Sequence, residues 1–314
     1  MSAPRLAGIE IGGTKAIAVL AEGAVLAEGA TIIDRLVVPT TTPGETLGAM
    51  ADRIARWDQA APIAALGIAS FGPIRLAVDA PDFGQILATA KPGWSGAPVF
   101  APFAERFSFP IAIDTDVNAA ALAEYRWGAG AGSAKSGACA SLVYVTIGTG
   151  IGGGVLVDGR SLTGRLHPEL GHILTRRDPS DRFAGVCPFH GDCVEGLLSG
   201  PALAARFGED SANVAPDDPR WTAAASDFAE FIAVLIHSFA PDRLLVGGGV
   251  GLGAPHLLAR ALTQVPAILG GYYPDLDATA LAAIVTAPAL GADAGPLGSI
   301  ALAWDAVAAR AAKP

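Results

Sequence analysis

The feature that most constrains the fold of this chain is an internal repeat. It pairs two segments, Ala7 to Leu26 and Leu142 to Leu162. Each contains an apolar strand, a turn rich in glycine and threonine, a second apolar strand, a polar turn with glycine, and the start of a third strand. The two turns match in composition as well as in the apolar alternation around them, which favours a duplication over a chance likeness between hairpins. The repeat predicts two lobes built to one plan, each with a glycine-rich turn.

Outside the two hairpins, predicted strands and helices alternate along the chain. This order predicts an α/β protein with mixed sheets flanked by helices, and 314 residues suffice for two packed lobes. We expect an N-terminal lobe at residues 1–117, onto which the last helix, about 298–314, packs back, and a C-terminal lobe at residues 118–297. The predicted elements are a helix from a capping box at Thr42 to about Gln59, strands at Ile63 to Ser70, Ile111 to Ile113 and Arg243 to Val246, and helices at Ala119 to Trp127, Pro201 to Phe207 and Trp221 to Phe239.

Composition excludes several classes of protein. The net charge of −9 and the pI near 5.0 argue against a nucleic-acid-binding surface. The longest uncharged stretch, residues 136–157, is rich in glycine and alternates, which is typical of a hairpin rather than of a membrane helix. The N-terminus has no signal-peptide pattern, and three cysteines are an odd number that does not suit a disulfide framework. We therefore expect a soluble, cytoplasmic protein.

Three glycine-rich turns are candidate phosphate-binding sites. Backbone N–H groups and threonine hydroxyls at the end of a strand can hold an oxyanion without cationic side chains. One such turn alone is usually structural, but two in equivalent places and a third one predict a nucleotide cleft between the lobes. The pattern is neither a Walker A loop nor a dinucleotide fingerprint. The turns are Gly12-Gly13-Thr14-Lys15, Gly148-Thr149-Gly150 and Gly247-Gly248-Gly249.

Asp116 lies between a short apolar strand and a helix. A carboxylate at that position either caps the helix or interacts with its dipole, or it acts as a general base toward a hydroxyl that attacks phosphorus. The residues alone leave both interpretations open, and Asp114 and Asn118 share the ambiguity.

Four nitrogen and sulfur ligands converge on the segment 172–195: His172, Cys187, His190 and Cys193. They suffice for a tetrahedral zinc site. The alternative, that two of three cysteines and two of five histidines gather by chance, is the weaker interpretation. A site closed by four protein ligands is structural and would order an otherwise irregular loop.

Glu169 and Glu195 flank the predicted zinc loop. Carboxylates placed by a rigid loop can accept hydrogen bonds from several hydroxyls of a polyol. Solvated surface charge is the alternative interpretation for both residues.

With these residues in view, the chain resembles the ROK sugar kinases, and among them the bacterial fructokinases, from Gly8 to about the last helix. The resemblance implies the two-lobed actin-like ATPase fold, which is ribonuclease H-like. Its motifs are a first phosphate motif at Glu10 to Lys15, a second at Val145 to Gly154, adenosine-side glycines at Gly247 to Gly249, the catalytic motif at Asp114 to Ala120, and the sugar and zinc signature at Glu169 to His172 and Cys187 to Glu195.

The resemblance implies an ATP-dependent hexose kinase that converts D-fructose to fructose 6-phosphate, with Asp116 as the general base. It further implies Mg²⁺ held through water by Glu10, a structural Zn²⁺ on His172, Cys187, His190 and Cys193, and a homodimer. The ATP-binding residues it implies are Gly12, Gly13, Thr14, Lys15, Thr146, Gly148, Thr149, Gly150, Gly247, Gly248 and Gly249. The sugar-binding residues it implies are Gly72, Pro73, Thr115, Asp116, Glu169, His172 and Glu195.

Three residues favour the fructokinase branch over the glucokinases of the family. Glu10 stands where an Asp is more usual, Thr115 stands where glucokinases often carry Asn, and His190 replaces one of three zinc cysteines. A kinase for glucose, mannose or an amino sugar stays an alternative, because the motifs do not separate these hexoses. A sugar-sensing transcriptional regulator is the non-enzymatic alternative. It is disfavoured because the first strand begins within a few residues of Met1, with no helix-turn-helix before it. The loop 176–182 fits no motif.

Overall fold

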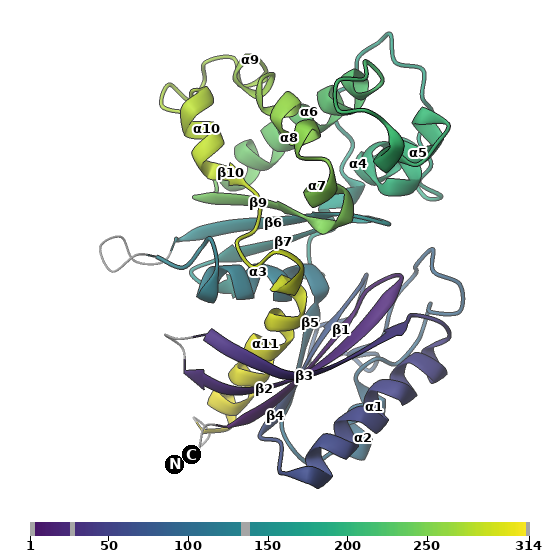
Figure 1. The fold of residues 1–314 in the computed structure, drawn as a ribbon, viewed down its shortest axis with the longest axis vertical. Coiled ribbons are helices and arrows are strands. Elements are labelled where there is room, and N and C mark those ends of the chain that lie inside the picture. The colour runs from purple at the N-terminus through teal and green to yellow at the C-terminus, as the bar shows by residue number, and fades with distance from the viewer. Residues whose placement is uncertain (1–3, 26–28, 133–138, 312–314) are drawn as a thin grey trace. The chain divides into compact units, whose positions relative to one another are not determined.

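The computed structural model describes residues 4–25, 29–132 and 139–311. The chain forms two compact units (Figure 1). Unit 1 comprises Met1–Ala138, Gly159–Pro168 and Ala292–Pro314, and unit 2 comprises Cys139–Asp158 and Glu169–Gly291. Parts of three predicted segments, residues 26, 136–138 and 312–314, lie outside the described residues.

Unit 1 is built on a five-stranded mixed sheet of order β3-β2-β1-β4-β5. β1 and β2 form the first predicted hairpin, β3 extends it antiparallel, and β4 and β5 run parallel to β1. In this register Ile11 pairs with Ser70 and Ser70 with Thr115, so the carboxyl ends of three neighbouring strands meet at one edge. The strands are β1 (Arg5–Ile11), β2 (Lys15–Val25), β3 (Gly29–Pro39), β4 (Ala65–Ser70) and β5 (Ile111–Thr115).

Helices cover both faces of this sheet (Figure 1). α1 (Pro43–Ala60) begins after its N-cap Thr42, which accepts the Glu45 N–H, and buries its apolar side in the core that also includes α2 (Ala101–Arg106). α11 (Ala294–Ala311) packs on β1 and β4 on the other face. Gly8 and Gly67 permit this close approach, since a side chain at either position would collide with Ser299 of α11.

The division of the chain differs from the one expected after residue 117. α3 (Asp116–Trp127) lies in unit 1, because it packs along α11. Arg126 forms an ion pair with Asp305 at 2.6 Å, and Gly298 lies so close to the Ala119 backbone that a side chain there would collide. α11 itself belongs to unit 1 and begins at Ala294, four residues before the expected start.

Unit 2 contains the second predicted hairpin, in a sheet in which its strands have the order β10-β9-β6-β7. β6 and β7 are antiparallel, while β9 runs parallel to β6 and β10 parallel to β9. Both sheets are mixed and flanked by helices, so the α/β fold class is confirmed. The strands are β6 (Ser141–Ile147), β7 (Ile151–Val157), β9 (Arg243–Gly247) and β10 (Val285–Thr286), while the short β8 (Arg160–Ser161) belongs to a segment of unit 1.

The long helix α6 (Trp221–Phe239) contacts α4, α8 and α9 in the core of unit 2. α6 is the one described helix long and apolar enough to cross a membrane, but it buries Trp221, Phe228 and Phe231 in the protein core. The remaining helices are η1 (Leu170–His172), α4 (Val194–Leu198), α5 (Gly200–Phe207), η2 (Ser211–Asn213), α7 (Gly248–Gly253), α8 (Pro255–Leu262), α9 (Val265–Leu269) and α10 (Ala278–Ile284), and η3 (Gly291–Asp293) leads to α11.

Candidate active site

The first glycine turn joins β1 to β2, and Thr40 holds its backbone from one side. The Gly12 N–H donates to the Lys15 carbonyl at 3.0 Å and closes the turn. Thr40, at the end of β3, donates its hydroxyl to the Gly12 carbonyl at 2.8 Å and its N–H to the Thr14 carbonyl at 2.9 Å. Gly13, Thr14 and Lys15 are exposed. The turn therefore has a fixed backbone and an open side, as a phosphate-binding turn requires.

Glu10 lies at the end of β1, directly before this turn. Its carboxylate lies against Gly295 in the first turn of α11, where any side chain would collide with it. Burial raises the pKa of Glu10 to about 7, and the negative charge of Asp116 contributes, while Lys15 opposes the rise. The carboxylate oxygens of Glu10 and Asp116 are hard donors of the kind that suits Mg²⁺.

Asp116 is the first residue of α3, and it does not cap that helix. The N-cap is Thr115, whose hydroxyl accepts the Asn118 N–H at 3.1 Å. Asp116 accepts the Val117 N–H at 2.9 Å, and burial raises its pKa to about 6. The N-cap is therefore Thr115, while Asp116 lies in the first turn of α3, where a carboxylate also interacts favourably with the helix dipole.

Asp114 and Asn118 hold the junction between β5 and α3. The buried Asp114 carboxylate accepts hydrogen bonds from the Asn118 amide at 2.8 Å, the Ser161 hydroxyl at 2.8 Å and the Thr115 N–H at 2.7 Å. Burial raises the pKa of Asp114. Because its oxygens are occupied by the protein, Asp114 is a structural residue that fixes the start of α3.

Gly72 and Pro73 lie one residue beyond the end of β4, the strand between β1 and β5. The peptide bond between them is cis, and the Pro73 carbonyl accepts the Leu87 N–H at 2.7 Å. Unit 1 thus brings Glu10, Gly72 and Asp116 to the carboxyl ends of three adjacent parallel strands, the edge at which ligands bind in many α/β sheets.

The second and third glycine turns lie side by side in unit 2. Thr146 pairs in register with Gly247, and a Cβ atom at Gly148 would lie 3.9 Å from the Gly249 nitrogen. Gly248 has φ of +83°, and a side chain there would collide with the backbone at the end of β6. Glycine is required at this position by both conformation and space. Together the turns form a backbone-lined surface at the ends of β6 and β9.

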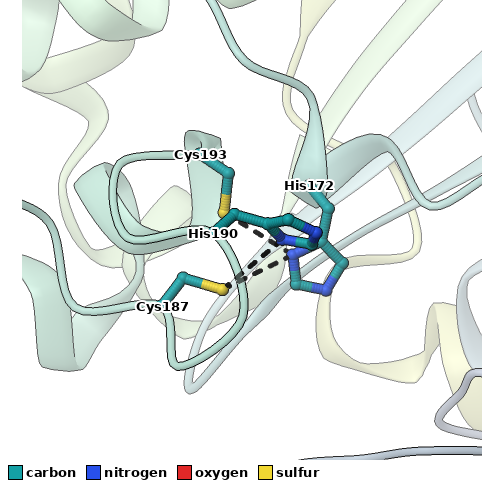
Figure 2. A group of neighbouring side chains, drawn as sticks. All are labelled: His172, Cys187, His190 and Cys193. Carbon is teal, nitrogen blue, oxygen red and sulfur yellow. Dashed lines mark hydrogen bonds between the residues drawn. The ribbon is translucent and has the colours of Figure 1, made fainter.

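The four predicted zinc ligands converge (Figure 2). Their ligand atoms lie within 4.8 Å of one another. The Cys193 sulfur is 3.5 Å from Nδ1 of His172, and the Cys187 sulfur is 3.8 Å from Nδ1 of both His172 and His190. Zinc bonds of about 2.3 Å to sulfur and about 2.0 Å to nitrogen at a tetrahedral angle separate the two atoms by about 3.5 Å. The cluster therefore fits a zinc ion.

The backbone of the metal loop supports the same interpretation. The Cys187 N–H donates to the Gly191 carbonyl at 3.1 Å, and the Gly191 N–H donates back to the Cys187 carbonyl at 2.9 Å. Gly191 has φ of +66°, which favours glycine. In the absence of a metal ion, burial raises the pKa of the Cys193 thiol to about 11. A bound cation would oppose that effect, because it stabilises the thiolate.

Glu169 lies directly before η1 and Glu195 lies in α4, and these two helices contact each other. Glu169 precedes η1, and its carbonyl accepts the His172 N–H at 3.0 Å. Glu195 lies in the first turn of α4, and its Oε2 accepts the Ile151 N–H at 2.9 Å.

The loop 176–182, to which the sequence assigned no role, is anchored by an ion-pair network. Arg177 pairs with Asp181 at 2.8 Å and with Asp192 of the metal loop at 3.2 Å. Arg206 of α5 pairs with Asp181 at 2.9 Å and with Asp227 of α6 at 2.6 Å. The loop therefore ties the metal loop to two helices. The alternating charges of this segment were the available signal, but nothing in the sequence identifies their partners on α5 and α6.

Comparison with known proteins identifies the family. The model of the ROK family matches residues 6–306. A fructokinase from Zymomonas mobilis is 43% identical over 271 residues, which cover 85% of this chain and 87% of that protein. A fructokinase from Pediococcus pentosaceus is 36% identical over 304 residues, which cover 96% of this chain and 98% of that protein.

A solved structure agrees with these relatives. The ROK family glucokinase from Streptomyces griseus in complex with glucose and AMPPNP has a TM-score of 0.72 at 25% identity, covering 96% of this chain and 99% of that one. The chain therefore belongs to the ROK family, and its relatives make it a sugar kinase of that family.

Proposed function

We propose that this protein is a fructokinase that transfers the γ-phosphoryl group of ATP to the 6-hydroxyl of D-fructose. The names of relatives at 36% and 43% identity support fructose as the sugar. The observation that carries the reaction type is the position of the Asp116 carboxylate, which directly follows the carboxyl end of β5 and is not the N-cap of α3.

Asp116 is the proposed general base. Its pKa of about 6 leaves the carboxylate deprotonated at neutral pH and still basic enough to accept the proton of the attacking hydroxyl. As that hydroxyl oxygen bonds to the γ-phosphorus, the bond from phosphorus to the β,γ-bridging oxygen breaks, and ADP leaves with the electron pair. The Val117 N–H holds the carboxylate in position during this step.

The ATP phosphates would bind to the two hairpin turns and Lys15, and the nucleoside to the glycines after β9. This assignment comprises Gly12, Gly13, Thr14, Lys15, Thr146, Gly148, Thr149, Gly150, Gly247, Gly248 and Gly249. A Mg²⁺ ion bound through water to Glu10 would neutralise charge on the transferred phosphoryl group. The residues that would hold the sugar are Gly72, Pro73, Thr115, Asp116, Glu169, His172 and Glu195.

A structural zinc ion on His172, Cys187, His190 and Cys193 would order the loop that leads to Glu195. Zinc-binding thiolates are compatible with a reducing compartment, so we infer a cytoplasmic location. The family resemblance also implies a homodimer. Sedimentation equilibrium, which gives the molecular mass in solution, tests this expectation.

The experiment that tests the function is an ADP-release assay with ATP, Mg²⁺ and a panel of fructose, glucose, mannose and N-acetylated amino sugars. We expect fructose to give the highest kcat/KM. A higher value for another hexose would identify the protein as a kinase for that sugar instead.

Asp116→Asn is the catalytic control in the same assay. We expect it to retain sugar binding by calorimetry and to lose about 10²–10⁴-fold in kcat, since a positioned base contributes about that much. For the wild-type enzyme, kcat should fall as the pH drops through about 6, because protonated Asp116 cannot accept a proton. A near-normal kcat in the variant would refute the role of Asp116.

A further inference from the structure

Glu195 contacts the second glycine turn. Its Oε2 accepts the N–H of Ile151, the first residue of β7, at 2.9 Å. A methyl group in place of the Gly150 hydrogen would lie 2.7 Å from the same oxygen. The carboxylate therefore lies directly against the exit of the turn, and the described residues place no hydrogen bond on its other oxygen, Oε1.

The segment that carries Glu195 also holds the entrance of the turn. The Gly200 N–H, at the start of α5, donates to the Gly148 carbonyl at 2.7 Å. The turn closes on itself through the Gly148 N–H and the Gly150 carbonyl at 2.9 Å. The Ile151 N–H is thus paired with a side chain 44 residues away in sequence. Both contacts come from the residues that directly follow the metal loop.

We propose that Glu195 is a positioning residue that couples sugar binding to the order of the phosphate turn. Oε2 holds the turn through Ile151, while Oε1 accepts a hydrogen bond from a sugar hydroxyl. This inference rests on the proposed sugar-binding role of Glu195. A sugar bound to Oε1 restrains the carboxylate and, through it, Ile151, so nucleotide binding becomes less costly in entropy. By linkage, the nucleotide increases sugar affinity by the same factor.

The test is calorimetric titration of metal-loaded, full-length protein with Mg²⁺–AMPPNP, with and without saturating fructose. We compare Glu195→Gln, Glu195→Asp and the wild type. Glutamine keeps the length and an acceptor oxygen for the Ile151 N–H, whereas aspartate keeps the charge and loses the reach. Glu169→Gln is the matched control, because Glu169 is the other proposed sugar glutamate and lies outside the turn.

For the wild type we expect fructose to lower the nucleotide Kd at least about fivefold, a typical coupling between sites. Glu195→Asp should raise the sugar-free nucleotide Kd about tenfold, the lower end for loss of a hydrogen bond to a charged group. It should also abolish the effect of fructose. Glu195→Gln and Glu169→Gln should both have the sugar-free nucleotide Kd of the wild type.

Hydrogen exchange at the Ile151 amide gives a second readout, which should accelerate in Glu195→Asp and stay slow in Glu195→Gln. Metal content is measured for every variant, so that a loss of zinc is not taken for a loss of the contact. A sugar-free Kd and a fructose effect that both match the wild type in metal-loaded Glu195→Asp would overturn the proposal. Failure of the fructokinase assignment is separate: it shows as no turnover of fructose by the wild type, while the sugar-free Kd and the exchange rate still report the contact.

Discussion

The two glycine turns of this kinase have similar hairpins but different supports. In each unit a parallel-paired strand ends in an Ile-Gly pair and turns back antiparallel, as Ile11-Gly12 and Ile147-Gly148 do. The residue before the isoleucine differs: Glu10 precedes the first turn and Thr146 the second. Only the first turn therefore has a titratable carboxylate at its strand end, which suits it to a cation.

The carbonyl oxygens of the turns are held by different parts of the chain. In unit 1 Thr40, the residue directly after β3, donates its hydroxyl to the Gly12 carbonyl. In unit 2 the Gly148 carbonyl binds the Gly200 N–H, and the exit of the turn binds Glu195. The first support comes from the residue that follows a sheet strand. The second comes from the segment that follows the predicted metal loop, so we expect loss of the metal to loosen the second turn more than the first.

Removal of the metal should produce the largest difference in amide exchange between the two turns. Zinc contributes on the order of 10 kcal/mol to folding in small zinc-dependent domains. We expect a chelator to accelerate amide exchange at Ile151, Val186 and Cys187 and to leave residues 12–15 unchanged, as measured by mass spectrometry. Cys193→Ser should reproduce this pattern, and Cys139→Ser is the matched control, because Cys139 lies outside the cluster. Equal loosening of both turns would contradict the difference in their supports.

Glu10→Gln should have an intermediate effect, a change in melting temperature that depends on pH. The folded pKa of Glu10 is raised from 4.5 to about 7, so the stabilising contribution of the protonated form is present below pH 4.5 and is lost as the pH rises through 7. The melting temperature of the variant relative to the wild type should therefore increase between pH 4.5 and 7 and level off above. Calorimetry in Mg²⁺-free buffer measures it.

The control for this measurement is Glu45→Gln. The pKa of this exposed carboxyl is lowered by its hydrogen bond from Thr41, so its stabilising contribution is already present above pH 4.5, and the difference between Glu45→Gln and the wild type should stay constant from pH 4.5 to 8. If the stability curves of Glu10→Gln and the wild type run parallel from pH 4.5 to 8, burial does not perturb Glu10.

Thr40→Val should have the smallest effect, confined to the first turn. The variant keeps the shape of the side chain and loses the hydrogen bond to the Gly12 carbonyl, which costs about 1 kcal/mol. We expect the Kd for Mg²⁺–AMPPNP to rise by the same factor with and without fructose. Thr263→Val is the control, since its hydroxyl donates to the Arg260 carbonyl at 2.7 Å in unit 2. A fructose-dependent change in Thr40→Val would show that the first turn also responds to sugar.

Much of the site could be predicted from types and spacing of residues. The candidate zinc ligands His172 and Cys193 were identifiable because metal ligands need particular atoms, and these occur close together in one segment. The roles of Asp114 and Asp116 were ambiguous, since the sequence does not show which residue caps α3. The structure assigns the cap to Thr115 and buries Asp114 against Ser161, 47 residues away.

The sequence by itself determined the two hairpins, the α/β class, the ROK motifs and the metal ligands. Each depends on local alternation, on glycine conformation or on chemistry within a short segment. Only the tertiary structure decided that α3 belongs to unit 1, that Thr40 and Gly200 hold the two turns, and that Glu195 reaches Ile151. The hydrogen bonds of Thr40, Glu195 and Gly200 join residues that are 28, 44 and 52 positions apart in sequence. A side chain's partner at that distance is set by how the sheets and helices pack, which no local pattern encodes.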